Sequence, residues 1–246
     1  MIFDNVVKKF YEHLPFNKTQ YQYIEAQIKK SDTPWPELTS AIQESKTVLE
    51  MGSGQGWLSN RIARNFPQVS VTGIDFVQEN INTSKNHQRH NSQFFMENII
   101  QTKKSADTVV SIGVLHHIPN NNIEDLIALA INSSNKYTFI GLYHDQSRKA
   151  MFDFFNRYPE NKRYKLFTKM TPWITDEQQR TSWYRDQFDN PYETTISLQQ
   201  FKQIAKQTQT DLIWSSVNTD NTYDSTMQRL ESYEFTSGFI YGLYKK

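Results

Sequence analysis

The chain of 246 residues lacks cysteine, and it contains no long apolar run. Disulfide bonds, thiolate chemistry and zinc–thiolate sites are therefore excluded. No stretch approaches the roughly 18 apolar residues that a membrane-spanning helix needs. The N-terminal residues contain neither a continuous apolar region nor a small-residue cleavage site, the two marks of a secretory signal. We therefore expect a soluble cytoplasmic protein without a membrane partner.

An excess of charge of one sign is also lacking. The 27 Lys and Arg residues nearly balance the 26 Asp and Glu residues, so the formal net charge is +1. Such a balance gives no general attraction to nucleic acid, and we expect no nucleic-acid partner. The length allows one sizeable core, and we interpret residues 1–246 as a single domain.

Glycine is scarce, and three of the eight glycines fall within five positions, at Gly52, Gly54 and Gly56. They separate a β-rich run from a helical pattern, where a backbone takes positive φ or approaches a ligand closely. The spacing departs from the G-x-G-x-x-G of dinucleotide sites, because Trp57 stands where the third glycine is expected. Glu50, just before the loop, favours a ligand that carries an amine over a pyrophosphate.

Short β-rich runs alternate with helical patterns in the first half of the chain, which predicts βα units around a parallel sheet. The expected strands are residues 47–51, 69–74, 94–96, 108–112 and 137–143. Residues 1–46 are helical and aromatic and are interpreted as an N-terminal cap.

The pattern changes after residue 143. Residues 144–192 form helical pieces without a convincing strand. Ser197 and Gln200 then form a capping-box pair ahead of a helix. Residues 193–246 are expected to complete the sheet with two strands, 211–217 and 237–244, as an antiparallel pair. The segment between these two strands carries no helix signal.

Acidic residues follow two of the predicted strands. Asp75 ends the second strand, and Glu97 and Asn98 end the third. A carboxylate at such a position can accept both hydroxyls of a ribose, and ligands of open α/β sheets bind at this edge. Each residue alone is also typical of an ordinary turn. Together with the glycine loop they predict a nucleoside site.

These motifs resemble the class I S-adenosylmethionine-dependent methyltransferases, over nearly the whole chain. Glu50 to Gly56 match the E/D-x-G-x-G-x-G motif, and residues 111–118 are similar to the fourth motif of ubiquinone- and menaquinone-pathway members. The resemblance implies a doubly wound, Rossmann-like α/β sheet of seven strands in the order 3-2-1-4-5-7-6, with strand 7 antiparallel. It implies S-adenosylmethionine as cofactor, bound by Glu50, Gly52, Ser53, Gly54, Gly56, Asp75, Phe76, Glu97, Asn98 and Gly113. In these relatives Glu50 lies near the methionine amino group and Phe76 packs on adenine.

A narrower likeness joins the chain to one bacterial subgroup whose members are named only as methyltransferases. It lies in residues 11–17, 140–144 and 183–193. Asn190 departs from the histidine that the subgroup commonly carries there, so no base or metal role is transferred to it. Insertions after strand 5 cover the substrate in this fold, which makes residues 144–192 the expected lid.

Three histidines are candidate proton acceptors. His116 and His117 follow the fourth strand, and His117 aligns with the histidine of the quinone-pathway relatives, so it is the favoured general base. A structural histidine that bonds the loop backbone is the alternative. His144, with Tyr143 as a substrate-binding neighbour and Asp145 to orient it, is the second candidate. No carboxylate at a suitable spacing completes a metal site with these histidines, and no metal is expected.

The lid contributes two further candidates for substrate binding, Arg185 and Asp186, among aromatic residues. An arginine flanked by aromatics favours an anionic or sugar-like substrate. The alternative is a salt bridge that holds the lid.

The sequence thus predicts methyl transfer to a small molecule, with a hydroxyl oxygen as the acceptor atom. N- or C-methylation and a non-catalytic S-adenosylmethionine-binding protein remain alternatives. RNA or protein methylation is a further alternative, although the N/D-P-P-Y/F motif of amino-group methylases is missing after strand 4. The acceptor and the oligomeric state are left open.

Overall fold

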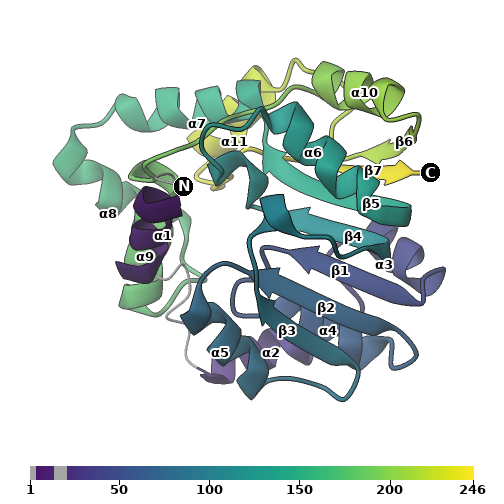
Figure 1. Cartoon of the computed structure of the whole chain (residues 1–246). Helices are drawn as coiled ribbons and strands as arrows, with labels where there is room; N and C mark the ends of the chain where they lie inside the picture. The colour runs from purple at the N-terminus through teal and green to yellow at the C-terminus, as the bar shows by residue number, and fades with distance from the viewer. Residues whose placement is uncertain (1–3, 14–20) are drawn as a thin grey trace.

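A seven-stranded sheet forms the centre of the molecule in the computed structural model, which describes residues 4–13 and 21–246 (Figure 1). The strand order is β3-β2-β1-β4-β5-β7-β6, and β7 is antiparallel to both β5 and β6. The predicted order and the antiparallel seventh strand are therefore confirmed. The strands are β1 (Thr47–Met51), β2 (Ser70–Asp75), β3 (Ser92–Met96), β4 (Ala106–Ile112), β5 (Ser134–Tyr143), β6 (Asp211–Ser215) and β7 (Phe239–Lys245).

The register brings the ends of the parallel strands to one edge of the sheet. Met51 of β1 pairs with Ile74 of β2, and Asp75 pairs with Met96 of β3. Ile112 at the end of β4 pairs with Gly141 of β5. The loops that follow these strands therefore meet, as expected for a parallel sheet.

Helices cover both faces of the sheet, so the doubly wound architecture is confirmed. On one face α3 (Pro36–Gln43) and α4 (Trp57–Asn65) bury an apolar cluster, and α5 (Gln78–Asn86) packs against β2 and β3. On the other face α6 (Ile123–Asn132) and α10 (Leu198–Gln207) bury a second cluster. The apolar stripe of α6 is buried at the positions that its periodicity predicts, and α10 begins with the predicted capping box.

The segment after β5 consists of α7 (Asp145–Asn156), α8 (Glu160–Met170) and α9 (Glu177–Phe188). In Figure 1 these helices lie at the end of the sheet where the parallel strands finish. They share an aromatic core with α11 (Tyr223–Glu231), which packs against α7. A helix between β6 and β7 was not expected. Its apolar residues are sparse among Asp, Ser and Thr, so contact with α7 rather than a strong local pattern stabilises it.

The N-terminal residues form α1 (Asp4–His13) and α2 (Tyr21–Ile28). Helix α2 packs on α4, whereas α1 lies beside α9 (Figure 1). Residues 14–17 of the subgroup motif lie outside the described residues. No helix in the described part of the chain has the length and apolarity to span a membrane.

Candidate active site

A cavity of about 370 Å³ opens at the edge where the parallel strands end. Its walls come from the loop after β1, the ends of β2, β4 and β5, helices α9 and α1, and the start of β7. The predicted site residues that line it are Glu50, Gly52, Ser53, Gly54, Asp75, Phe76, Asn98, Gly113, His117, Tyr143 and Asp186. The structure therefore brings most of the predicted cofactor residues and part of the predicted substrate residues to one cavity.

The glycine loop is fixed by its backbone. The N–H groups of Gly52 and Ser53 both donate to the carbonyl of Ile74, at 2.8 and 2.9 Å. Gly52 has φ +79°, and a Cβ there would overlap the side chain of Val114, so only glycine fits. The hydroxyl of Ser53 is buried at the cavity and has no hydrogen-bond partner, which leaves it available to a ligand. Gly56 precedes α4 and does not line the cavity.

Asp75 is held between the glycine loop and the start of α5. Its carboxylate accepts hydrogen bonds from Gly54 N (2.9 Å), Val77 N (2.9 Å) and Asn80 Nδ2 (3.2 Å). Burial raises the pKa of this carboxyl. The three donors fix the position of the carboxylate in the cavity wall.

Glu50 is a buried carboxyl without a cation. Its Oε2 accepts from Ser59 N (3.0 Å) and Ser59 Oγ (2.5 Å). Burial raises the pKa of Glu50 to about 8. Within the described residues, no Lys, Arg or His lies at salt-bridge distance from it. A ligand with an amino group would supply the missing positive charge.

Glu97 does not reach the cavity, although Asn98 does. Its carboxylate lies 3.0 Å from Lys104 Nζ and is partly exposed. The pair with Lys104 turns the Glu97 side chain away from the cavity, whereas Asn98, the next residue, lines it. The prediction that Glu97 binds the cofactor does not fit this placement.

His117 lines the cavity in a defined tautomer. Its Nδ1 lies 2.8 Å from the backbone oxygen of Tyr192, and because a carbonyl only accepts, Nδ1 carries the proton. Nε2 is left with its lone pair on a ring that lines the cavity. Burial lowers the pKa of His117 to about 4, so the ring is neutral at pH 7. The two expectations, a backbone-bonded histidine and a proton acceptor, are therefore compatible.

His116 lies behind the cavity wall. Its ring is fully buried and stacks on Tyr143 at 4.1 Å between centroids, and neither ring nitrogen has a hydrogen-bond partner. Burial lowers its pKa well below the usual value. It does not line the cavity, so a direct proton transfer from substrate to His116 does not fit the structure.

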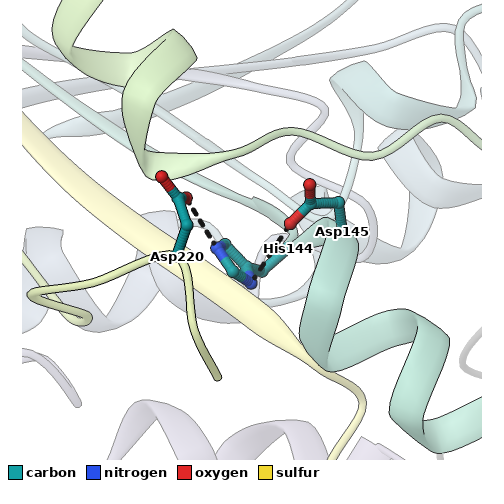
Figure 2. Close-up of side chains that lie close together, drawn as sticks. All are labelled: His144, Asp145 and Asp220. Carbon is teal, nitrogen blue, oxygen red and sulfur yellow. Dashed lines mark hydrogen bonds and ion pairs between the residues drawn. The ribbon is translucent and has the colours of Figure 1, made fainter. Parts of the chain in front are cut away.

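His144 also lies away from the cavity, between two carboxylates (Figure 2). Nε2 lies 3.2 Å from Asp220 Oδ1, and Nδ1 lies 3.0 Å from Thr222 Oγ1 and 3.6 Å from Asp145 Oδ1. Both ring nitrogens are therefore engaged, which corrects the prediction that His144 is a base.

Spacing along the sequence showed no carboxylate that completes a set with these histidines, but Asp220, which is distant in sequence, lies beside His144 together with Asp145. In Figure 2 the two carboxylates face different ring nitrogens of His144. Asp220 also accepts the first N–H groups of α10, from Leu198 and Gln199. The cluster therefore joins the ends of three segments through hydrogen bonds.

Helix α9 places Asp186, rather than Arg185, in the cavity wall. The Arg185 side chain is 45% exposed and pairs with Asp189 at 3.4 Å. The expectation of an anionic substrate held by Arg185 does not fit this orientation. Asp186 Oδ1 accepts from the hydroxyl of Tyr11 (3.0 Å), and Oδ2 accepts from Gln187 Nε2 (3.1 Å). Burial raises the pKa of Asp186 to about 6.

Arg148 supports this wall and was not among the predicted residues. Its buried guanidinium forms a two-pronged pair with Glu193 (2.7 and 2.5 Å) and donates to Gln187 Oε1 (2.9 Å). Because an arginine only donates, this bond turns Gln187 Nε2 towards Tyr143 and Asp186. The guanidinium also lies 3.8 Å from the centre of the Tyr143 ring. One signal was present: Arg148 stands on the same helical face as Met151 and Phe155, which are buried.

Residues 32–210 match a family model described as a methyltransferase domain. A malonyl-[acyl-carrier protein] O-methyltransferase from Bacillus anthracis is 25% identical over 114 residues, which are 45% of this chain and 42% of the relative. An enzyme of the same name from Halalkalibacterium halodurans is 32% identical over 73 residues, 28% of this chain and 27% of the relative. The matches span less than half the length of these curated relatives.

Solved structures share the fold. A magnesium protoporphyrin IX methyltransferase from Synechocystis PCC 6803 with bound S-adenosylhomocysteine has a TM-score of 0.57 at 10% identity, over 99% of this chain and 95% of that chain. A cyclopropane synthase from Mycobacterium tuberculosis has a TM-score of 0.57 at 12% identity, over 96% and 98%. At such identities the likeness is one of fold.

Proposed function

The chain belongs to the methyltransferase-domain family, and we propose that it methylates a hydroxyl oxygen of a small molecule. Its cofactor is S-adenosylmethionine, which supplies the activated methyl group when bound. The orientation of His117 carries the choice of acceptor atom, because a neutral imidazole with a free Nε2 lone pair lines the cavity. A hydroxyl must lose a proton during methylation, and this nitrogen can accept it.

The residues at the glycine loop fit the cofactor by their chemistry. Glu50 would hold the α-amino group, because it is a buried carboxyl without a cation. Asp75 would hold the ribose hydroxyls, and the unpartnered Ser53 hydroxyl offers one further hydrogen bond. Phe76 and Asn98, which also line the cavity, would contact the adenine.

Proton and electrons are accounted for within this arrangement. The acceptor oxygen uses a lone pair to bond the methyl carbon, and the carbon–sulfur electron pair stays on sulfur. The hydroxyl proton goes to Nε2 of His117 and from there to water. The remaining contribution of the protein is to hold the reacting atoms in line, which accounts for a large part of the rate enhancement in two-substrate reactions.

Replacing Asp75 with alanine should abolish cofactor binding. The variant loses the ribose-binding carboxylate together with the bonds that fix Gly54 and Val77. We expect S-adenosylhomocysteine to bind the wild type in isothermal calorimetry, and the affinity of Asp75→Ala to fall at least about 100-fold, as when several charge-assisted bonds are lost. Failure of the wild type to bind either S-adenosylmethionine or S-adenosylhomocysteine would contradict the proposed function.

Replacing His117 with glutamine should slow methyl transfer without releasing the cofactor. General-base catalysis contributes about 10²- to 10⁴-fold to the rate. With 3,4-dihydroxybenzyl alcohol, an uncharged catechol, as the test acceptor, we expect kcat to decrease by a factor in that range. The affinity for S-adenosylhomocysteine should stay within about threefold, a change of less than about 1 kcal/mol. His90→Gln, at an exposed histidine outside the cavity, is the matched control. An unchanged kcat in His117→Gln would show that another group accepts the proton.

A further inference from the structure

We propose that Asp186 is the acceptor-binding group of this cavity, and that it selects phenols that carry no negative charge. The inference rests on the proposed methyl transfer and goes beyond it, because it names the substrate class. It reverses the charge expected from Arg185, whose side chain points away from the cavity.

The negative charge of the cavity wall disfavours an anionic acceptor. Glu50, Asp75 and Asp186 line the cavity, whereas no Lys or Arg is among the described residues that do so. Glu50 and Asp75 belong to the glycine-loop side, so Asp186 on α9 is the carboxylate that faces the acceptor. An anionic acceptor would bring like charges together in a buried site, where their repulsion is strong.

Asp186 retains capacity for a ligand. A carboxylate offers about four acceptor positions. Oδ1 accepts from Tyr11 (3.0 Å) and, at the limiting distance of 3.5 Å, from Asn190, whereas among the described residues Oδ2 accepts only from Gln187. Both Tyr11 and Gln187 also line the cavity, so these bonds hold the carboxylate in the wall while Oδ2 keeps a free lone pair.

The cavity wall beside Asp186 consists of aromatic and imidazole side chains. The Tyr11 ring centre lies 6.2 Å from that of His117, which lies 5.8 Å from Tyr143, and Tyr143 lies 4.8 Å from Phe239. All four residues line the cavity. Offset and edge contacts with such rings stabilise an aromatic ligand by about 0.5–1.5 kcal/mol per pair beyond its burial.

Acidity favours a phenol over an aliphatic alcohol. The available proton acceptors are weak bases, since burial places the pKa of His117 at about 4 and that of Asp186 at about 6. A phenol has a pKa of about 10, whereas an aliphatic alcohol is a far weaker acid. Tyr11 and Tyr143 cannot act as acceptors of the proton, because burial raises the pKa of each phenol. In this arrangement Asp186 binds the acceptor, and the phenol proton passes to the Nε2 lone pair of His117 as the phenol oxygen bonds the methyl carbon.

Three catechols with one ring and different charge test this selection. These are 3,4-dihydroxybenzyl alcohol (uncharged), 3,4-dihydroxybenzoate (anionic) and dopamine (cationic), each titrated at pH 7.5 into the S-adenosylhomocysteine complex and each assayed for its methyl ether with S-adenosylmethionine. We expect the wild type to favour the benzyl alcohol over the benzoate at least tenfold in affinity and in kcat/KM, which is about 1.4 kcal/mol. Dopamine should bind at least as well as the benzyl alcohol.

Variants at one position separate charge from shape. Asp186→Asn should bring the ratio between benzyl alcohol and benzoate close to one, whereas Asp186→Glu should keep it. Asp189→Asn, on the exposed face of the same helix, is the matched control and should leave the ratio unchanged. If Asp186→Asn fails to bind S-adenosylhomocysteine, the wild-type ratio and Asp186→Glu decide.

Three results would overturn the proposal: a wild type that binds none of the three catechols, a wild type that prefers the benzoate, or a folded Asp186→Asn with an unchanged ratio. A wild type that does not bind S-adenosylhomocysteine would instead overturn the proposed function itself. The two failures are therefore distinguishable in the same experiment.

Discussion

Replacing Arg148 with methionine should lower the melting temperature by roughly 10 °C, a consequence of removing one partner of a buried ion pair at about 3–5 kcal/mol and about 2–4 °C per kcal/mol in a chain of this size. The guanidinium is buried and satisfies both oxygens of Glu193 together with Gln187 Oε1. Methionine keeps much of the side-chain volume but leaves the Glu193 carboxylate without its cation. Gln187 also loses the bond that orients its amide towards Tyr143 and Asp186.

A second substitution distinguishes the effect of losing the ion pair from the effect of losing side-chain packing. The double variant Arg148→Met/Glu193→Leu removes the unpaired carboxylate, so it should regain at least half of the lost melting temperature. Lys149→Met is the matched control on the same helix, because its pair with Asp153 is exposed and such pairs contribute about 0–1 kcal/mol. Thermal unfolding followed by circular dichroism measures all three. An Arg148→Met protein as stable as Lys149→Met would contradict the role assigned to this pair.

The sheet and its glycine loop were predictable because their signals are local. Alternating β-rich and helical runs specify βα units, and strand ends that carry Asp75 and Asn98 necessarily meet at one edge of a parallel sheet. Glu97 shows the limit of that rule. It follows the same strand as Asn98, but its side chain pairs with Lys104 and does not line the cavity.

The contacts of Asp186 and of His144 were less predictable because they join distant segments. Tyr11 and Asp186 are 175 positions apart, and Asp220 is 76 positions from His144. Spacing along the chain carries no signal for such pairs. The choice between Arg185 and Asp186 is a matter of helical phase, since neighbouring residues differ by about 100° around a helix. Helix α9 has no clear apolar stripe, so its sequence does not reveal which of the two faces inward.

Replacing Glu50 with glutamine should weaken cofactor binding and stabilise the protein at the same time. Loss of a charge-assisted bond to the α-amino group, about 1.5–3 kcal/mol, lowers the affinity for S-adenosylhomocysteine by roughly 10- to 150-fold. In the absence of ligand, however, the wild-type carboxyl is strained by burial, which raises its pKa from 4.5 to about 8. Glutamine accepts from Ser59 in the same way without a charge to bury.

The raised pKa of Glu50 makes the folding stability of the wild type depend on pH. Between pH 4.5 and about 8 the folded wild type holds a proton that the unfolded chain has lost, so stability falls as the pH rises through this range. The glutamine variant has no such loss. We expect it to be more stable than the wild type by up to about 5 kcal/mol above pH 8, and to match it near pH 4.5.

Calorimetry at several pH values tests how the ionisation of Glu50 affects the affinity for the ligand. Ligand binding requires the ionised carboxyl, so wild-type affinity should rise by up to tenfold per pH unit from pH 6 towards pH 8. It should fall again at higher pH, where the ligand's α-amino group loses its proton. In Glu50→Gln the affinity should not rise between pH 6 and pH 8. Glu97→Gln, outside the cavity, should bind as the wild type does at every pH. A glutamine variant whose affinity still rises from pH 6 to pH 8 would show that another group binds the amine. One that is less stable than the wild type above pH 8 would show that the buried charge is already compensated before the cofactor arrives.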